Sequence, residues 1–323
     1  MTSQEVALGI DIGGTNTKLG LVNSVGNCLS ESSIPTDSHK PIEDFLDRIA
    51  TEVEKLKATA GLDVDIFAVG MGAPNGNYYT GTIEKAPNLG WGEIVPMAKL
   101  IEGKLGLKTT LTNDANAAAI GEMMYGVAQG MKNFVVITLG TGLGSGIVVN
   151  GDLVYGHDGF AGEVGHTTVF WGGRDLPTGR KGSLEAYASA TGIRRTVFEL
   201  LSKRLHPSPL RKMSFEELEA HHISEAALNG DPIALEAFEY TGKILGMKLS
   251  DVVAILSPEA IILFGGLAKA GDLITKPTKK YMEEYNLNIF QNKVKVLVSN
   301  LKGSNTAVLG ASALAWKERD KAK

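Results

Sequence analysis

A pattern of strand, glycine-rich turn and strand occurs twice in this chain, and it limits the possible folds more than any other feature. The first copy reads VALGIDI, GGTNTK and LGLV, and the second reads FVVITL, GTGLGS and GIVVN. Shifting the second copy back by 127 residues places Gly140 on Gly13 and Asn150 on Asn23. Glycine-rich hairpins can also resemble one another by chance, but the matching order of elements favours a duplicated α/β fold.

The remaining pattern alternates between apolar runs and helical periodicity, which predicts two α/β domains for 323 residues. No linker rich in Pro, Ser or Gly divides the chain. We place the boundary in the helix predicted over 114–130, so that 1–115 and about 305–323 form a smaller lobe and 116–304 a larger one. The other predicted helices cover 41–59, 94–105, 192–205, 214–229, 231–256 and 305–318, and further strands cover 66–72, 109–113, AIILFGG and KVKVLVS.

Composition excludes several classes of protein. Lys and Arg number 32 against 36 Asp and Glu, so the net charge of −4 gives no basic surface for nucleic acid. Cys28 is the only cysteine, which excludes an intrachain disulfide and a cysteine-based zinc cluster. The chain shows no secretory signal and no apolar run of the roughly 20 residues that span a bilayer. We therefore expect a soluble, cytoplasmic protein with no membrane partner.

The first glycine turn follows a buried strand that ends in a carboxylate, Asp11. Burying a carboxylate costs free energy and needs a compensating partner. Gly13 and Gly14 let backbone N–H groups approach an anion, and Thr15 adds a hydroxyl donor. Asp11 would then bind a divalent cation carried by that anion. The alternative is an aspartate that stabilises its own turn, which extends to Lys18.

The second turn, Gly140-Thr141-Gly142-Leu143-Gly144, supplies a similar set of N–H groups. It is neither a Walker motif nor the G-x-G-x-x-G turn of dehydrogenases, because a strand follows it instead of a helix. Two such hairpin turns can hold one polyphosphate from two sides.

Several polar side chains outside the turns are candidates for binding and catalysis. Asn113 and Asp114 stand where a strand meets a helix, so Asp114 is either a helix cap or a general base for an acceptor hydroxyl. Glu163, His166 and Glu185 lie in a polar stretch and suit recognition of several vicinal hydroxyls, or are solvated loop residues. Asn88 adds an amide in the turn APNLGW, which is otherwise an ordinary loop.

Taken together, these segments resemble the ROK family of bacterial sugar kinases and related repressors. The resemblance covers nearly the whole chain through GIDIGGTNTK, GAPN, APNLGW, TNDANAAAIGE, TLGTGLGSGIV, GEVGH, GRKGSLEAYAS, LFGG and GSNTAVLGASALAW. It implies a ribonuclease-H-like, actin-type fold of two α/β lobes, with ATP and sugar in the cleft between them. A homodimer or homotetramer is also implied.

The resemblance assigns a role to each candidate. It implies ATP and Mg²⁺ as cofactors, with Asp11 near the metal, and Asp114 as the base. The expected sugar ligands are Asn88, Asn113, Asp114, Glu163, His166 and Glu185. The expected nucleotide contacts are Asp11, Gly13, Gly14, Thr15, Lys18, Gly140, Thr141, Gly142, Gly144, Gly265 and Gly266.

Two departures from the family pattern refine these expectations. The family commonly has a zinc site of one histidine and three cysteines, but the three cysteine positions here read Leu176, Thr178 and Ser183. Only His166 remains, so we expect no zinc site. ROK repressors also carry an N-terminal winged helix-turn-helix, whereas the first turn here begins near residue 11, and we expect an enzyme.

The expected activity is ATP-dependent transfer of the γ-phosphoryl group to the 6-hydroxyl of a hexose, most simply glucose. Three alternatives remain at this point. The acceptor could be another sugar, such as N-acetylmannosamine, fructose or allose, and the donor could be polyphosphate. The chain could also be a non-catalytic, sugar-sensing member of the family.

Overall fold

The computed structural model describes residues 3–61, 63–176, 179–301 and 306–321, which belong to two compact units. Unit 1 comprises residues 1–130, 153–161 and 300–323, and unit 2 comprises 131–152 and 162–299. The chain first passes from unit 1 to unit 2 after Gly130, and not after residue 115 as the sequence predicted. The reason is that helix α3 (Asp114–Tyr125) packs against helix α9 (Thr306–Lys321) within unit 1. The segment 153–161 is held in unit 1 by Tyr155, whose ring stacks on that of Tyr78 with centroids 4.1 Å apart.

Unit 1 is built on a sheet of five strands in the order β3-β2-β1-β4-β8. Strands β1 and β2 form the predicted antiparallel hairpin, while β4 and β8 run parallel to β1. The bounds are β1 Gln4–Ile12, β2 Asn16–Val22, β3 Cys28–Pro35, β4 Val64–Ala73 and β8 Thr109–Asn113. A small sheet of β5 (Gly76–Asn77), β6 (Thr82–Glu84) and β7 (Ile94–Val95), which the sequence analysis did not predict, lies between β4 and β8 in the chain.

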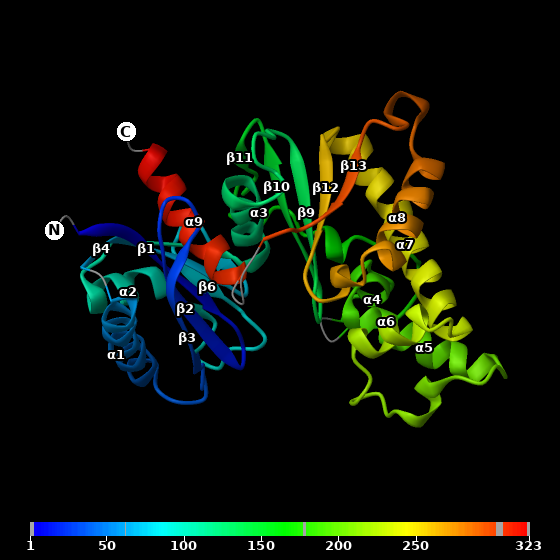
Figure 1. The fold of residues 1–323 in the computed structure, drawn as a ribbon, viewed down its shortest axis with the longest axis horizontal. Coiled ribbons are helices and arrows are strands. Elements are labelled where there is room, and N and C mark those ends of the chain that lie inside the picture. Colours follow the sequence, from blue (N-terminus) through cyan, green and yellow to red (C-terminus); the bar gives the residue numbers. More distant parts are fainter. Residues whose placement is uncertain (1–2, 62, 177–178, 302–305, 322–323) are drawn as a thin grey trace. The chain divides into compact units, whose positions relative to one another are not determined.

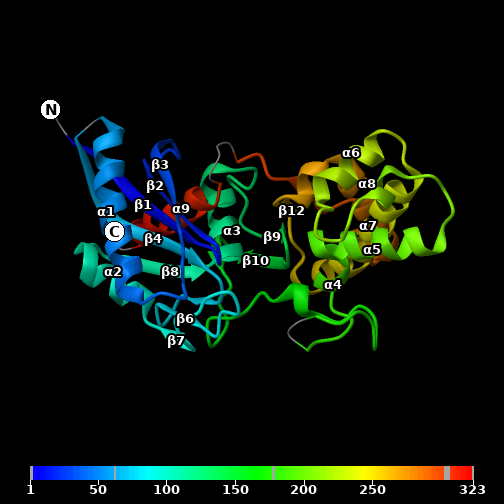
Figure 2. The same ribbon diagram turned by 90° about the horizontal axis from the view of Figure 1, so that it is seen from below.

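Helices cover both faces of this sheet, as alternation along β1 requires. Leu8 and Ile10 face a core shared with helices α1 (Ile42–Ala60) and α2 (Met97–Leu105). Ala7, on the opposite face, packs with Trp316 of α9. The indole N–H of Trp316 also donates to the carbonyl of Val22, 3.2 Å away. Figure 1 shows α9 running along β1 and β4, and Figure 2 shows the same elements after a quarter turn.

Unit 2 repeats the topology of unit 1. Its sheet has the order β11-β10-β9-β12-β13, again with an antiparallel hairpin (β9 and β10) followed by parallel strands. A shift of 127 residues places β10 on β2. The duplication expected from the sequence is therefore confirmed by the strand order. The bounds are β9 Phe134–Leu139, β10 Leu143–Val149, β11 Asp152–Leu153, β12 Ala260–Phe264 and β13 Lys295–Val298.

Five α-helices of the described residues complete unit 2, and three differ from expectation. The four-residue helix α4 was not predicted. Helix α6 is shorter than the predicted 214–229, because Ser214 and Glu217 form a local turn before it. Helix α8 was not predicted and lies beside α7 in both views (Figures 1 and 2). The bounds are α4 Glu185–Ala188, α5 Ala190–Lys203, α6 Ala220–Leu228, α7 Pro232–Leu256 and α8 Asp272–Tyr285, with short 3₁₀ helices η1 Val164–His166, η2 Pro209–Lys212, η3 Leu267–Ala270 and η4 Asn288–Phe290.

Among the described residues, every helix is too short or too polar to cross a lipid bilayer.

Candidate active site

The first glycine turn closes the hairpin between β1 and β2 in unit 1. The N–H of Gly13 donates to the carbonyl of Asn16 at 3.0 Å, whereas the N–H groups of Gly14 and Thr15 have no acceptor in the described part of the chain. A Cβ atom on Gly14 would lie 2.9 Å from the Cβ of Asn88, so only glycine allows the loop at Asn88 to approach this closely. The structure thus brings Asn88 to the turn and leaves two N–H donors there for an anion.

Asp11 and Asp114 lie at the same edge of the unit 1 sheet. Asp11 pairs with Gly72 of β4, and Ala73 pairs with Asn113 at the end of β8, immediately before Asp114. Burial, and next the negative charge of Asp114, raise the pKa of Asp11 to about 6, while Lys18 opposes the shift. Two carboxylates that repel each other supply the hard oxygen ligands that Mg²⁺ prefers, so this edge fits a divalent cation.

Asn113 and Asp114 stand at the junction between β8 and α3, where a side chain can act as a helix cap or as a general base. Asn113 is the helix cap, since its side-chain oxygen accepts from the N–H of Asn116 at 2.7 Å. Asp114 is the first helical residue, and one of its oxygens accepts from the N–H of Ala115 at 2.8 Å. Asp114 has access to solvent at its surface. Many protein atoms nevertheless surround its carboxylate, and the resulting desolvation raises the pKa of Asp114. The capping position is therefore occupied by the neighbouring residue, Asn113, and not by Asp114.

The second glycine turn, in unit 2, closes in a similar way to the first but is one residue tighter. The N–H of Gly140 donates to the carbonyl of Gly142, two residues on, at 3.1 Å, whereas Gly13 donates to the carbonyl of Asn16, three residues on. The N–H of Gly144, expected to bind phosphate, instead donates to the hydroxyl of Thr138 at 3.1 Å. Thr141 and Gly142 keep unbonded N–H groups within the described residues, and the 127-residue shift places them on Gly14 and Thr15. Both halves of the repeat therefore present donors at the same two positions.

Glu185 lies directly on this second turn, a contact that the sequence did not indicate. Its Oε2 accepts from the N–H of Leu143 at 2.8 Å, and a Cβ on Gly142 would lie 2.5 Å from the same oxygen. Glu185 starts helix α4, so the helix and the turn are held together through one carboxylate oxygen. Its other oxygen has no hydrogen-bond donor among the described residues.

Glu163 precedes the short helix η1 and His166 is its last residue, and η1 packs on β10. The hydroxyl of Ser145 donates to the carbonyl of Gly162 and accepts from the N–H of Val164 at 3.2 Å. His166 Nε2 lies 3.7 Å from Glu163 Oε2, and both side chains are partly exposed. Within unit 2, therefore, Glu163, His166 and Glu185 all lie on segments attached to the start of β10.

Gly265 and Gly266 follow β12, which pairs with β9. Gly265 has a φ of +99° and lies against the backbone of Leu139, the residue before the second turn. Only glycine adopts this conformation readily. The structure thus places the predicted nucleotide contacts Gly265 and Gly266 next to the turn at Gly140.

The loop expected to lack zinc is held by an arginine that the sequence analysis did not single out. The side chain of Arg174 is only 10% exposed and stacks over the ring of Tyr187, 4.5 Å from its centroid. Its guanidinium donates to the carbonyls of Ala186 and Gly192 and forms a two-bond pair with Glu199. Leu176 and Ser183 occupy two of the cysteine positions, and Thr178 lies outside the described residues. Among those described, no three His, Cys, Asp or Glu side chains could hold a metal.

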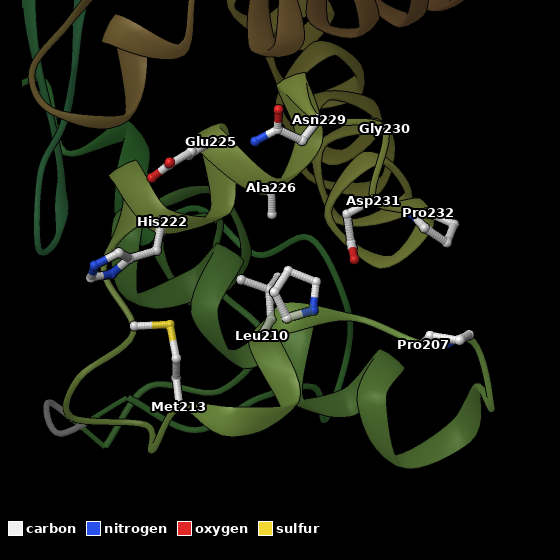
Figure 3. Close-up of a pocket in the computed structure, with 11 residues that line it drawn as sticks. Pro207, Leu210, Met213, His222, Glu225, Ala226, Asn229, Gly230, Asp231 and Pro232 are labelled. Carbon is white, nitrogen blue, oxygen red and sulfur yellow. The ribbon is translucent and has the colours of Figure 1, made fainter.

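A pocket of about 430 Å³ in unit 2 contains none of the predicted site residues (Figure 3). Leu210 and Met213 form an apolar wall, and His222 and Asp231 stand at its rim. Two of the polar residues that line it, His222 and Asp231, have structural roles. Asp231 caps α7 by accepting from the N–H of Ala234 at 2.8 Å, and His222 accepts from the N–H of Glu219 at 3.1 Å. This pocket is not a candidate active site.

The two sheets have the same topology, and each has a glycine turn after its first strand. Together with the carboxylates at the edge of one sheet, they define a two-lobed, phosphotransferase-type fold of the ribonuclease-H-like, actin-type class. The chain belongs to the ROK family, whose model matches residues 7–318. The fold and the family expected from the sequence are thereby confirmed.

Its relatives include enzymes and regulators. A glucokinase from Halalkalibacterium halodurans is 34% identical over 97% of this chain and 96% of its own. The crystal structure of a ROK family glucokinase from Streptomyces griseus with glucose and AMPPNP has a TM-score of 0.81 and 32% identity, covering 97% of this chain and 99% of that one. A ROK family transcriptional regulator, a homologue of the E. coli MLC protein, has a TM-score of 0.86 and 26% identity, covering 97% of this chain and 78% of that one.

Proposed function

We propose that this protein is an ATP-dependent sugar kinase that transfers the γ-phosphoryl group of ATP to the 6-hydroxyl of a hexose, with glucose as the preferred sugar. The observation that carries the proposal is the pair Asp11 and Asp114 at one sheet edge, beside a turn with unbonded N–H donors. A protein that only senses sugar has no need of this arrangement. The glucokinase relatives support the same activity.

In this proposal the two glycine turns bind the phosphates. The N–H groups of Gly14 and Thr15, and those of Thr141 and Gly142, donate to phosphate oxygens. Asp11 would hold a Mg²⁺ ion directly or through a water, and the ion would supply neutralisation of the phosphate charge. The ionised form of Asp11 would be favoured with the cation bound.

The sugar hydroxyls are bound by Asn88, Asn113, Glu163, His166 and the free oxygen of Glu185. Asp114 accepts the proton of the 6-hydroxyl as the phosphoryl group is transferred. Its raised pKa makes it a stronger base than an ordinary aspartate, and a general base contributes typically about 10²–10⁴-fold to the rate. The rest of the acceleration comes from positioning and electrostatic stabilisation.

A coupled ADP-release assay over a panel of hexoses tests the activity. Glucose should give the highest kcat/KM, with mannose and N-acetylmannosamine at least about tenfold lower, because a carboxylate left unpaired by an inverted or replaced hydroxyl costs about 1–3 kcal/mol. A higher kcat/KM for another sugar would contradict the glucose assignment and keep the kinase. Measuring the formation of hexose 6-phosphate with polyphosphate in place of ATP tests the donor.

The similarity to a transcriptional regulator favours one alternative, a sugar-binding protein without catalysis. Calorimetric titration with glucose separates the two functions. Binding of glucose without ADP release, in the presence of ATP and Mg²⁺, would contradict the kinase and establish the sensor.

A further inference from the structure

Thr36, just after β3, is fully buried and contacts the first glycine turn through both its side chain and its backbone. Its hydroxyl donates to the carbonyl of Gly13 at 2.7 Å. Its N–H donates to the carbonyl of Thr15 at 2.8 Å. One residue outside the glycine motif therefore occupies two of the carbonyl groups of the turn.

These two hydrogen bonds determine which way the turn presents its N–H groups. In a planar trans peptide, the N–H of one residue points opposite to the C=O of the residue before it. Because the Gly13 carbonyl faces Thr36, the N–H of Gly14 points away from Thr36. The Thr15 carbonyl also faces Thr36, so the N–H of Asn16 points away from Thr36 as well. Thr36 thus fixes two peptide planes of the turn.

Thr36 is itself held from two other elements. The hydroxyl of Thr17, also fully buried, lies 2.9 Å from that of Thr36. Since Thr36 gives its proton to Gly13, Thr17 is the donor of this pair. Arg48 of α1 donates to the carbonyl of Thr36 at 3.0 Å. The turn is therefore connected through Thr36 to β2 and to α1, and cannot rotate its peptide planes freely.

We propose that Thr36 is a positioning residue for nucleotide binding, which it supports by orienting the Gly14 N–H donor of the first turn. This inference rests on the proposed function, in which that turn binds the phosphates of ATP. Valine matches threonine in shape but lacks the hydroxyl, so Thr36→Val frees the Gly13 peptide plane while the backbone bond to Thr15 stays. Serine keeps the hydroxyl and loses only the methyl group.

A matched control is available in the same unit. Thr109 is also buried, and its hydroxyl donates to a backbone carbonyl, that of Leu107, at 2.9 Å. It starts β8, at the end of that strand opposite Asn113 and the candidate site. Thr109→Val therefore removes a comparable hydrogen bond without touching the turn.

The experiment measures Kd for ADP with Mg²⁺ and Kd for glucose by calorimetry, and KM for ATP by the ADP-release assay. Thr36→Val should raise Kd for ADP and KM for ATP by about 5- to 30-fold, with Kd for glucose within about twofold. Thr36→Ser should stay within about threefold of the wild type, and Thr109→Val should leave all three constants unchanged. A merely structural effect of Thr36 would change sugar and nucleotide binding alike.

Nucleotide constants for Thr36→Val equal to those of Thr109→Val would overturn the inference. If Thr36→Val does not fold, Thr17→Val replaces it, with an expected rise in Kd for ADP of about three- to fivefold; an unchanged Kd would likewise overturn the inference. Absence of ADP binding by the wild type would instead contradict the proposed function.

Discussion

Replacing Arg174 with methionine should destabilise unit 2 more than any substitution of a surface arginine. Methionine keeps most of the apolar length of the side chain and removes the guanidinium. Three acceptors then lose a charged donor inside the protein: the carbonyls of Ala186 and Gly192 and the hydroxyl of Thr196, all within 3.1 Å of Arg174. Of these, the Gly192 carbonyl still accepts from the hydroxyl of Thr196. The pair with Glu199 is lost as well.

The magnitude follows from these contacts. A buried acceptor left without its charged donor costs about 1–3 kcal/mol, and losses that share one side chain add incompletely. The Glu199 side chain is 48% exposed, so its ion pair adds less than about 1 kcal/mol. The sum is about 3–5 kcal/mol, which corresponds to a fall in Tm of roughly 8–16 °C for a unit of this size. Arg174→Lys keeps the charge but not the planar fork, and should lose about half as much.

Differential scanning calorimetry measures the fall in Tm, and hydrogen exchange followed by mass spectrometry localises it. The amide N–H groups of Gly182 and Leu184, bonded to the carbonyls of Arg174 and Thr167, should exchange faster in the variant. The control is Arg204→Met, because Arg204 forms a similar two-bond pair with Glu236 but is 48% exposed. An equal fall in Tm for the two variants would refute the reasoning.

Three further predictions concern the candidate site. Asp114→Asn should abolish turnover and keep Kd for glucose within about tenfold of the wild type, because the substitution removes the base and keeps the shape of the side chain. Turnover above about a tenth of the wild type in the ADP-release assay would exclude Asp114 as the base. The pKa of Asp11 is raised to about 6 from 3.8, so its ionisation destabilises the folded protein as pH rises through this range. In ligand-free protein, Asp11→Asn should therefore raise the free energy of unfolding at pH 8 by about 1–3 kcal/mol, and by much less at pH 4; an equal gain at both pH values would contradict this origin. Purified protein should contain no stoichiometric zinc and should keep its activity after chelation once Mg²⁺ is restored, which elemental analysis and the ADP-release assay can check.

The repeat, the strands and the glycine turns could be predicted because each depends on local sequence. Alternation of apolar residues and turn glycines marks β1, β2, β9 and β10 without knowledge of their partners. Helix α8 could not be predicted in this way. Pro277 lies inside it, and its residues are mostly polar, so only its packing against α7 makes it helical.

Contacts between distant segments also escaped prediction. The sequence indicated Glu185 as a sugar ligand, but gave no sign that it accepts from Leu143 on the second turn. Thr36 and Arg174 belong to no glycine motif, and their contacts reach 23 and 25 residues along the chain. Such residues act through hydrogen bonds that only the folded chain creates.

The position of helix α9 sets the order in which the chain can fold during synthesis. Residues 306–321 are synthesised after the strands of both sheets, yet they cover the face of the unit 1 sheet that contains Ala7, and Trp316 is buried there. Unit 2 ends at Ser299 and is therefore synthesised in full before α9, although unit 1 begins first. Until α9 has been made, nascent unit 1 leaves this apolar face uncovered, which exposes it to association with other chains and to chaperones.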